Sequence, residues 1–161
     1  MMRQDFVGED LRDQIFSGAD LNGVNFSNAN LSNVNLAGAN LSHANLSHVN
    51  LSNANLVNAI LIEATLDGVD LCNADMSGAN LSLACFSNQA DLCGVKFLSA
   101  NLTEAQLSDA NLVGADFDRA ILTGVTIENS NLDDAKLAHA NLHRAKFTNV
   151  KMRGADLFGA D

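Results

Sequence analysis

Three cysteines are the residues of this chain that are best suited to covalent or metal chemistry. Cys72 and Cys93 each follow a leucine that belongs to a five-residue pattern, and Cys85 lies between them in the sequence. If four repeats make one coil and one extra residue is allowed for, Cys72 and Cys93 fall on the same face of consecutive coils, so we expect them to be close neighbours. A disulfide is one outcome, but free thiols are the expectation in a cytoplasmic protein. Without a CxxC pair or a neighbouring histidine, the cysteines predict no metal site.

Four histidines could serve as general bases or metal ligands, but the pattern does not bring them together. His43 and His48 occupy turns of adjacent sides, His139 occupies another turn, and His143 lies beside Arg144. Catalysis and metal binding need side chains directed at one point. The chain also lacks the GxGxxG, GxxxxGKS and GxSxG motifs. We therefore predict no catalytic, cofactor-binding or metal-binding residues, and we expect that the protein is not an enzyme.

The elements that position these residues follow a five-residue repeat. A large apolar residue, usually leucine, occurs at every fifth position from Phe6 to Phe86 and again from Leu92 to Leu157. Two positions before it stands a small residue, most often alanine, and a polar residue separates the two. This alternation is typical of a short β-strand, and the Ser, Gly, Asn and His residues that follow are typical of a turn.

A helix does not fit this period, because five residues advance the helix by about 500° and successive leucines would face every direction. A strand that turns a corner in each repeat keeps every leucine and alanine directed towards one axis. Successive coils would then stack at the parallel-strand spacing of about 4.8 Å. The sequence therefore predicts a β-solenoid.

The run FSGADLNGVNFSNANLSNVNLAGANLSHANLSHVNLSNANL resembles the pentapeptide-repeat proteins, and the repeat A(D/N)LSx covers nearly the whole chain. The resemblance implies an all-β fold, a right-handed quadrilateral parallel β-helix in which four repeats make one coil. About seven to eight such coils would form a single domain over residues 1–161. One extra residue between Phe86 and Leu92, near 87–91, is expected to form a bulge that preserves the register.

The composition indicates a protein whose hydrophobic residues are buried in its own core. Hydrophobic residues make up 47% of the chain, yet no apolar run approaches the roughly 18 residues that a membrane span requires. The repeat begins almost at the first residue, with no apolar leader segment before it. We therefore expect a cytoplasmic protein with no membrane partner.

Charge is unevenly distributed along the chain, whose formal net charge is −10 at pH 7. No Asp, Glu, Lys or Arg occurs in residues 22–62, whereas residues 63–134 are strongly acidic and residues 135–155 are basic. Charged and polar columns of this kind keep a repeat rod in solution. The negative net charge argues against direct nucleic-acid binding.

The family resemblance also implies an alternative function. Some pentapeptide-repeat proteins, including the quinolone-resistance proteins, resemble B-form DNA and bind type II topoisomerases in its place. The opening FVGEDLRDQIFSGADL is similar to the start of those proteins. The alternative is therefore a DNA-mimicking regulator that binds DNA gyrase or topoisomerase IV. The uncharged first half and the basic far end interrupt the acidic ladder that such mimicry needs.

Apolar residues in place of polar repeat residues indicate where a protein partner would bind. Five of them occupy outward or corner positions, several on two adjoining sides: Val57, Ile60, Ile62, Leu83 and Leu98. The last coil shows no polar capping repeat, so we expect end-to-end contact between two copies through a second set: Leu142, Phe147, Met152, Leu157 and Phe158. The main functional prediction is a non-enzymatic structural scaffold or protein-interaction module with an unidentified protein partner.

Overall fold

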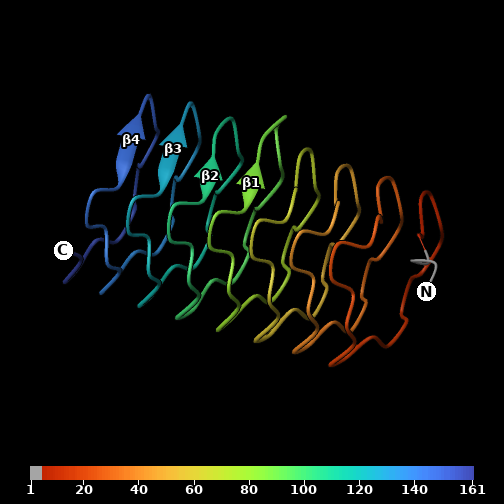
Figure 1. The fold of residues 1–161 in the computed structure, drawn as a ribbon. Coiled ribbons are helices and arrows are strands. Elements are labelled where there is room, and N and C mark those ends of the chain that lie inside the picture. Colours follow the sequence, from red (N-terminus) through yellow and green to blue (C-terminus); the bar gives the residue numbers. More distant parts are fainter. Residues whose placement is uncertain (1–4) are drawn as a thin grey trace.

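The chain forms a rod of stacked, four-sided coils with its two termini at opposite ends (Figure 1). The computed structural model describes residues 5–161, so the first four residues of the predicted domain lie outside the described part. Parallel pairing joins each outward residue to the one twenty positions later, as Asp10 pairs with Asn30 and Asn30 with Asn50. Four five-residue repeats therefore complete one coil. The fold is a right-handed quadrilateral parallel β-helix, as the family resemblance implied.

Each coil presents one outward residue on each side, and these residues form four columns along the rod. The first side carries Asp10, Asn30, Asn50, Asp70, Asp91, Asn111, Asn131 and Lys151. The second side carries Ile15, Asn35, Asn55, Asp75, Lys96, Asp116, Lys136 and Asp156. The third side carries Asp20, Asn40, Ile60, Asn80, Asn101, Ile121 and Asn141. The fourth side carries Asn25, Asn45, Thr65, Cys85, Gln106, Thr126 and Lys146.

Strands longer than a single bridge occur, within residues 5–161, on the fourth side. They are β1 (Cys85–Phe86), β2 (Gln106–Leu107), β3 (Thr126–Glu128) and β4 (Lys146–Thr148). They form one parallel sheet in the order β1-β2-β3-β4 (Figure 1). The other sides pair through single-residue bridges, because each flat stretch is short before the next turn. No helix that could cross a membrane occurs among residues 5–161.

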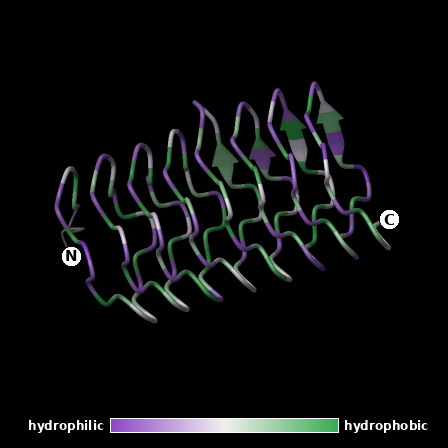
Figure 2. Ribbon diagram, turned by 180° about the vertical axis from the view of Figure 1, so that it is seen from behind, coloured by the Kyte–Doolittle hydropathy of each residue, from purple (hydrophilic) through white to green (hydrophobic). Residues whose placement is uncertain are grey.

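The inward residues form one continuous hydrophobic core along the rod. Leucine, alanine, valine and phenylalanine side chains from Leu21 to Ala140 are almost completely buried. Phe97 and Phe117 stack in adjacent coils with their ring centroids 5.0 Å apart. Hydrophobic and hydrophilic residues alternate in short stretches along the coils (Figure 2). The alternation of a short strand therefore buries the leucines and leaves the residues between them in contact with water.

The turns explain why the repeat is rich in asparagine and serine. Asn50 accepts, through Oδ1, a hydrogen bond from the backbone N–H of Ser52 at 2.9 Å, and the Ser52 hydroxyl donates to the same oxygen at 2.7 Å. The next residue adopts a positive φ in coil after coil, 57° at His43 and 58° at Asn53. Asn, Asp and Gly tolerate this conformation best, whereas proline cannot adopt it. The outward Asn thus bonds the turn that follows it.

One extra residue enters the turn that follows β1. Asp70 pairs with Asp91, a step of 21 residues, and Asp91 pairs with Asn111 at the ordinary step of 20. Asn88 and Gln89 both have a positive φ, so the extra residue is accommodated by the backbone of the turn. The central leucines of the following repeats, from Leu92 to Leu137, remain buried because the flat sides are unchanged.

Ser130 lies in the corresponding turn two coils after the extra residue, at a position where the repeat has a small apolar residue. Its side chain is buried, and its hydroxyl accepts a hydrogen bond from the backbone N–H of Ala110 at 3.0 Å. The same hydroxyl lies 3.0 Å from the carbonyl oxygen of Leu107 and 2.8 Å from that of Glu128. The hydroxyl therefore links the Ala110 N–H and the Leu107 carbonyl of one turn, two groups that in other turns bond directly, as the Ala105 N–H does with the Leu102 carbonyl.

Candidate interaction surfaces

The third side of the rod carries an apolar strip. Ile60 and Ile121 stand in its outward column, 39% and 43% exposed, and Asn80 and Asn101 lie between them. Every other residue of this column is Asn or Asp. Two isoleucines are thus presented to solvent on a flat surface where the repeat ordinarily places an amide or a carboxylate.

The two turns that border the third side extend this apolar strip. Val57 and Leu98 lie in the turn before the third side, and Ile62 and Leu83 lie in the turn after it. Leu83 and Leu98 are 48% and 42% exposed, whereas Val57 and Ile62 are half-buried. The structure therefore places all five residues of the predicted patch on the third side and its edges. We name these five residues together with Ile121 the apolar third side.

Ile121 was missed by the sequence prediction, although its signal was the same as that of Ile60. Both residues replace the asparagine that precedes the central leucine of the repeat. They share a column because Asn80 pairs with Asn101 across the extra residue, a step of 21, and Asn101 then pairs with Ile121.

Acidic side chains border the apolar third side. Glu63 and Glu104 flank Leu83 in the turn column, since each backbone N–H in this column bonds to the coil that follows. The Glu63 carboxylate also lies 3.3 Å from Nδ1 of His43, and both side chains are about half exposed. The apolar third side therefore carries negative charge along one edge.

The predicted end-to-end residues belong to the last coil of the rod. Leu142, Phe147 and Met152 are partly buried against the core. Leu157 is 46% exposed and Phe158 is 73% exposed. The Phe158 ring contacts His139 edge-on, with ring centroids 5.4 Å apart. These residues thus form a second apolar surface, which is separate from the apolar third side.

The second side carries an alternating column of charges. Lys96 Nζ lies 3.7 Å from Asp75 Oδ2, and Lys136 Nζ lies 3.4 Å from Asp116 Oδ2. Burial raises the pKa of Asp75, but hydrogen bonds from Ser77 and the charge of Lys96 lower it by more, so its pKa lies below the ordinary value. Opposite charges therefore neutralise each other along this side.

The remaining acidic residues are distributed around the rod. Acidic side chains on the other sides and their turns include Asp10, Asp70 and Asp91 (first side), Asp20, Glu63 and Glu104 (third side), and Asp67, Asp109 and Glu128 (fourth side). In the outward columns of residues 5–161, neutral or basic residues interrupt the acids on the first three sides, and the fourth column, from Asn25 to Lys146, contains no acid. The excess negative charge thus surrounds the rod and forms no uninterrupted acidic column.

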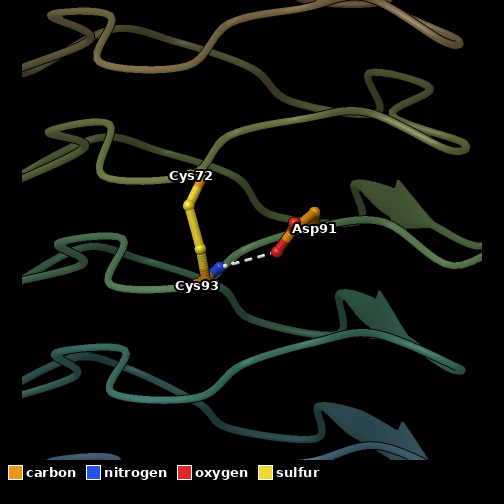
Figure 3. A group of neighbouring side chains, drawn as sticks. All are labelled: Cys72, Asp91 and Cys93. Atoms are coloured by element: carbon orange, nitrogen blue, oxygen red, sulfur yellow. Dashed lines mark hydrogen bonds between the residues drawn. A yellow bond between two sulfur atoms is a disulfide. The ribbon is translucent and has the colours of Figure 1, made fainter.

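Cys72 and Cys93 form a disulfide between consecutive coils, with their Cα atoms 4.8 Å apart. The predicted proximity is confirmed, and the expectation of free thiols at this pair is wrong. Both cysteines take the same turn position, so the stacking of coils brings their side chains face to face (Figure 3).

Cys85 is a free thiol on the fourth side, and burial together with the nearby Asp67 carboxylate raises its pKa.

Comparison with known proteins assigns the chain to a family. The family model described as pentapeptide repeats (8 copies) matches residues 4–33, 15–53, 50–88, 88–124, 100–137 and 127–161. The chain therefore belongs to the pentapeptide-repeat family. No curated protein matches it in sequence.

Two solved structures illustrate how far the likeness extends. A trypsin-treated variant of QnrB1, a plasmid-mediated fluoroquinolone resistance protein, superposes with a TM-score of 0.81 at 18% identity, over 100% of this chain and 87% of that one. HetL from the cyanobacterium Nostoc sp. strain PCC 7120, a pentapeptide repeat protein involved in heterocyst differentiation regulation, gives a TM-score of 0.51 at 27% identity, over 99% and 90% of the two chains. The likeness to QnrB1 shows a shared fold.

Proposed function

We propose that this protein is a non-enzymatic interaction module and that the apolar third side is its docking surface. The observation that carries the proposal is the gathering of six apolar side chains on one side and its two edges, where the repeat itself requires polar residues. An exposed apolar surface with a polar rim is typical of protein-binding sites.

The acidic edge of the apolar third side indicates the charge of the partner. Glu63 and Glu104 border the strip, and the chain carries a net charge of −10. A protein segment with apolar side chains and flanking Lys or Arg residues would complement both features. Such a partner would place its apolar groups over Ile60 and Ile121, which are three coils apart, or about 14 Å at the parallel-strand spacing.

Crosslinking followed by mass spectrometry tests this proposal with a variant that restores the repeat. Ile60→Asn, Ile121→Asn and Leu83→Ser together place ordinary repeat residues on the third side, so the fold is expected to be retained. Val113→Ser, in the turn after the first side, is the matched control. We expect partners captured by the wild type and by the control to be lost from the triple variant. Unchanged partners and an unchanged oligomeric state in the triple variant would refute the proposal.

A supercoiling assay with DNA gyrase distinguishes this proposal from the DNA-mimic alternative. The absence of an uninterrupted acidic column in residues 5–161 favours a docking surface based on apolar contact. We expect no inhibition of supercoiling and no protection from a quinolone. Inhibition or protection that weakens as salt is raised would instead support binding in place of DNA.

A further inference from the structure

Asp91 lies beside the Cys72–Cys93 pair and completes a group of three ligand-bearing side chains. One sulfur from each cysteine and one carboxylate oxygen of Asp91 all lie within 4.8 Å of one another. Figure 3 shows the carboxylate adjacent to the backbone N–H of Cys93. All three side chains are partly exposed, so an ion could reach them from solvent.

The fold holds this aspartate in place. Asp91 Oδ1 accepts a hydrogen bond from the backbone N–H of Cys93 at 3.2 Å and from Nδ2 of Asn111 at 2.9 Å. Both bonds go to the same oxygen. The carboxylate is thus oriented by the turn and by the next coil, as a ligand is when its surroundings orient it in advance.

We propose that the reduced Cys72–Cys93 pair, together with Asp91, forms a binding site for Zn²⁺. Two thiolates and one carboxylate are zinc ligands, and three protein ligands leave a fourth position for water. Zinc–sulfur bonds of about 2.3 Å at tetrahedral angles place two sulfurs on one ion about 3.8 Å apart. The Cα separation of 4.8 Å therefore allows both sulfurs to reach a single ion.

The disulfide and the zinc site are two states of the same pair. A dithiol reductant supplies two electrons and two protons, which break the sulfur–sulfur bond and form two thiols, while the reductant becomes a disulfide. Zn²⁺ then displaces the two thiol protons into solvent and binds the thiolates. In the reverse step a disulfide oxidant takes two electrons from the thiolates and two protons from solvent and becomes a dithiol, while the Cys72–Cys93 bond forms again and the ion is released. Binding is thus restricted to reducing conditions.

The neighbouring coil provides a matched control for the role of Asp91. Asp70 stands next to Asp91 in the first-side column, and its Oδ1 accepts a hydrogen bond from the backbone N–H of Cys72 at 2.9 Å. Asp70 therefore has the same repeat position and the same turn bond, but it does not belong to the three-residue group. Replacement of each aspartate by asparagine keeps the turn bond and removes one carboxylate.

Cobalt(II) titration of the full chain, followed by competition with Zn²⁺, tests the site. The reduced wild type should show a sulfur-to-cobalt absorption band that Zn²⁺ abolishes, and the oxidised protein should show none. Cys72→Ser and Cys93→Ser should weaken the band, whereas Cys85→Ser should retain it. An absent band in the reduced wild type, or equal binding by oxidised and reduced protein, would overturn the proposal.

The third ligand is tested by zinc affinity. Because even outer-shell partners of a bound metal are worth roughly tenfold in affinity, Asp91→Asn should weaken Zn²⁺ binding by at least about tenfold and Asp70→Asn by much less. Circular dichroism confirms that each variant is folded. Equal affinities of the two asparagine variants would show that Asp91 is not a ligand.

Discussion

Residues 22–62 and residues 63–161 share one backbone and one core but differ in surface chemistry. The first region carries no Asp, Glu, Lys or Arg, and the second carries most of the charge of the chain. In both regions the outward residue bonds the next turn, as Asn45 does with Ser47 at 3.0 Å and Asp75 does with Ser77 at 3.0 Å. The difference teaches that an acceptor oxygen at this position bonds the following turn whether or not it carries a charge.

This equivalence of the two regions predicts equal losses from matched core deletions. Leu51 and Leu112 are both fully buried on the first side, one in each region. Leu51→Ala and Leu112→Ala should each lower the free energy of unfolding by about 2–5 kcal/mol, because each leaves a cavity in a packed core. Urea denaturation followed by circular dichroism measures both. Clearly unequal losses in the two variants would show that the two regions differ in their cores as well as in their surfaces.

A smaller effect is expected where the turn bond is removed from the uncharged region. Asn45 Oδ1 accepts bonds from the Ser47 N–H at 3.0 Å and from the Ser47 hydroxyl at 2.7 Å, and its column neighbours Asn25 and Thr65 are neutral. Asn45→Ala should cost about 1–2 kcal/mol, since each lost hydrogen bond contributes about 1 kcal/mol.

The matched substitution Asn45→Asp keeps the acceptor oxygen and should lower stability by less than Asn45→Ala at neutral pH. Thermal unfolding of the two variants beside the wild type makes the comparison. If Asn45→Asp proves as destabilising as Asn45→Ala, the charge of the outward residue matters and the two regions are not interchangeable.

The smallest expected effect concerns pH in the charged region. Because the folded-state pKa of Asp75 lies below its ordinary value, its contribution to stability is present above the unfolded pKa and is lost as pH falls through the folded pKa. Asp75→Asn keeps the Ser77 bond but removes this charge. At pH 7 the free energy of unfolding of the wild type should exceed that of the variant by less than about 1 kcal/mol, because the ion pair between Asp75 and Lys96 is partly exposed to water.

Unfolding curves of wild type and Asp75→Asn between neutral and acidic pH provide the measurement. The gap in stability should narrow as Asp75 becomes protonated, below about pH 4. A gap that stays constant through this range would show that Asp75 stabilises the rod by means other than its charge.

Much of this architecture is predictable because a periodic backbone converts distance along the sequence directly into position in space. The five-residue spacing of leucines predicts a solenoid, and the family resemblance implies four repeats to a coil. One extra residue then explains why Cys72 faces Cys93 across 21 positions. The same arithmetic places Asn25, Asn30 and Asn35 next to the residues twenty positions later. These neighbour relations follow from the number of residues in each coil and need no knowledge of side-chain conformation.

Other features depend on side-chain direction and on contacts between coils. The nearness of an Asp91 oxygen to both sulfurs follows from its bonds to Cys93 and Asn111, which a polar repeat position does not reveal. The bonding of Ser130 follows from the direction of its hydroxyl, which contacts Ala110 and Leu107 of the preceding coil. The sequence by itself thus determined the rod, its register and the neighbours along each column. The tertiary structure decided the disulfide, the position of Asp91 and the strands on the fourth side, because these depend on rotamers and turn geometry that the repeat leaves free.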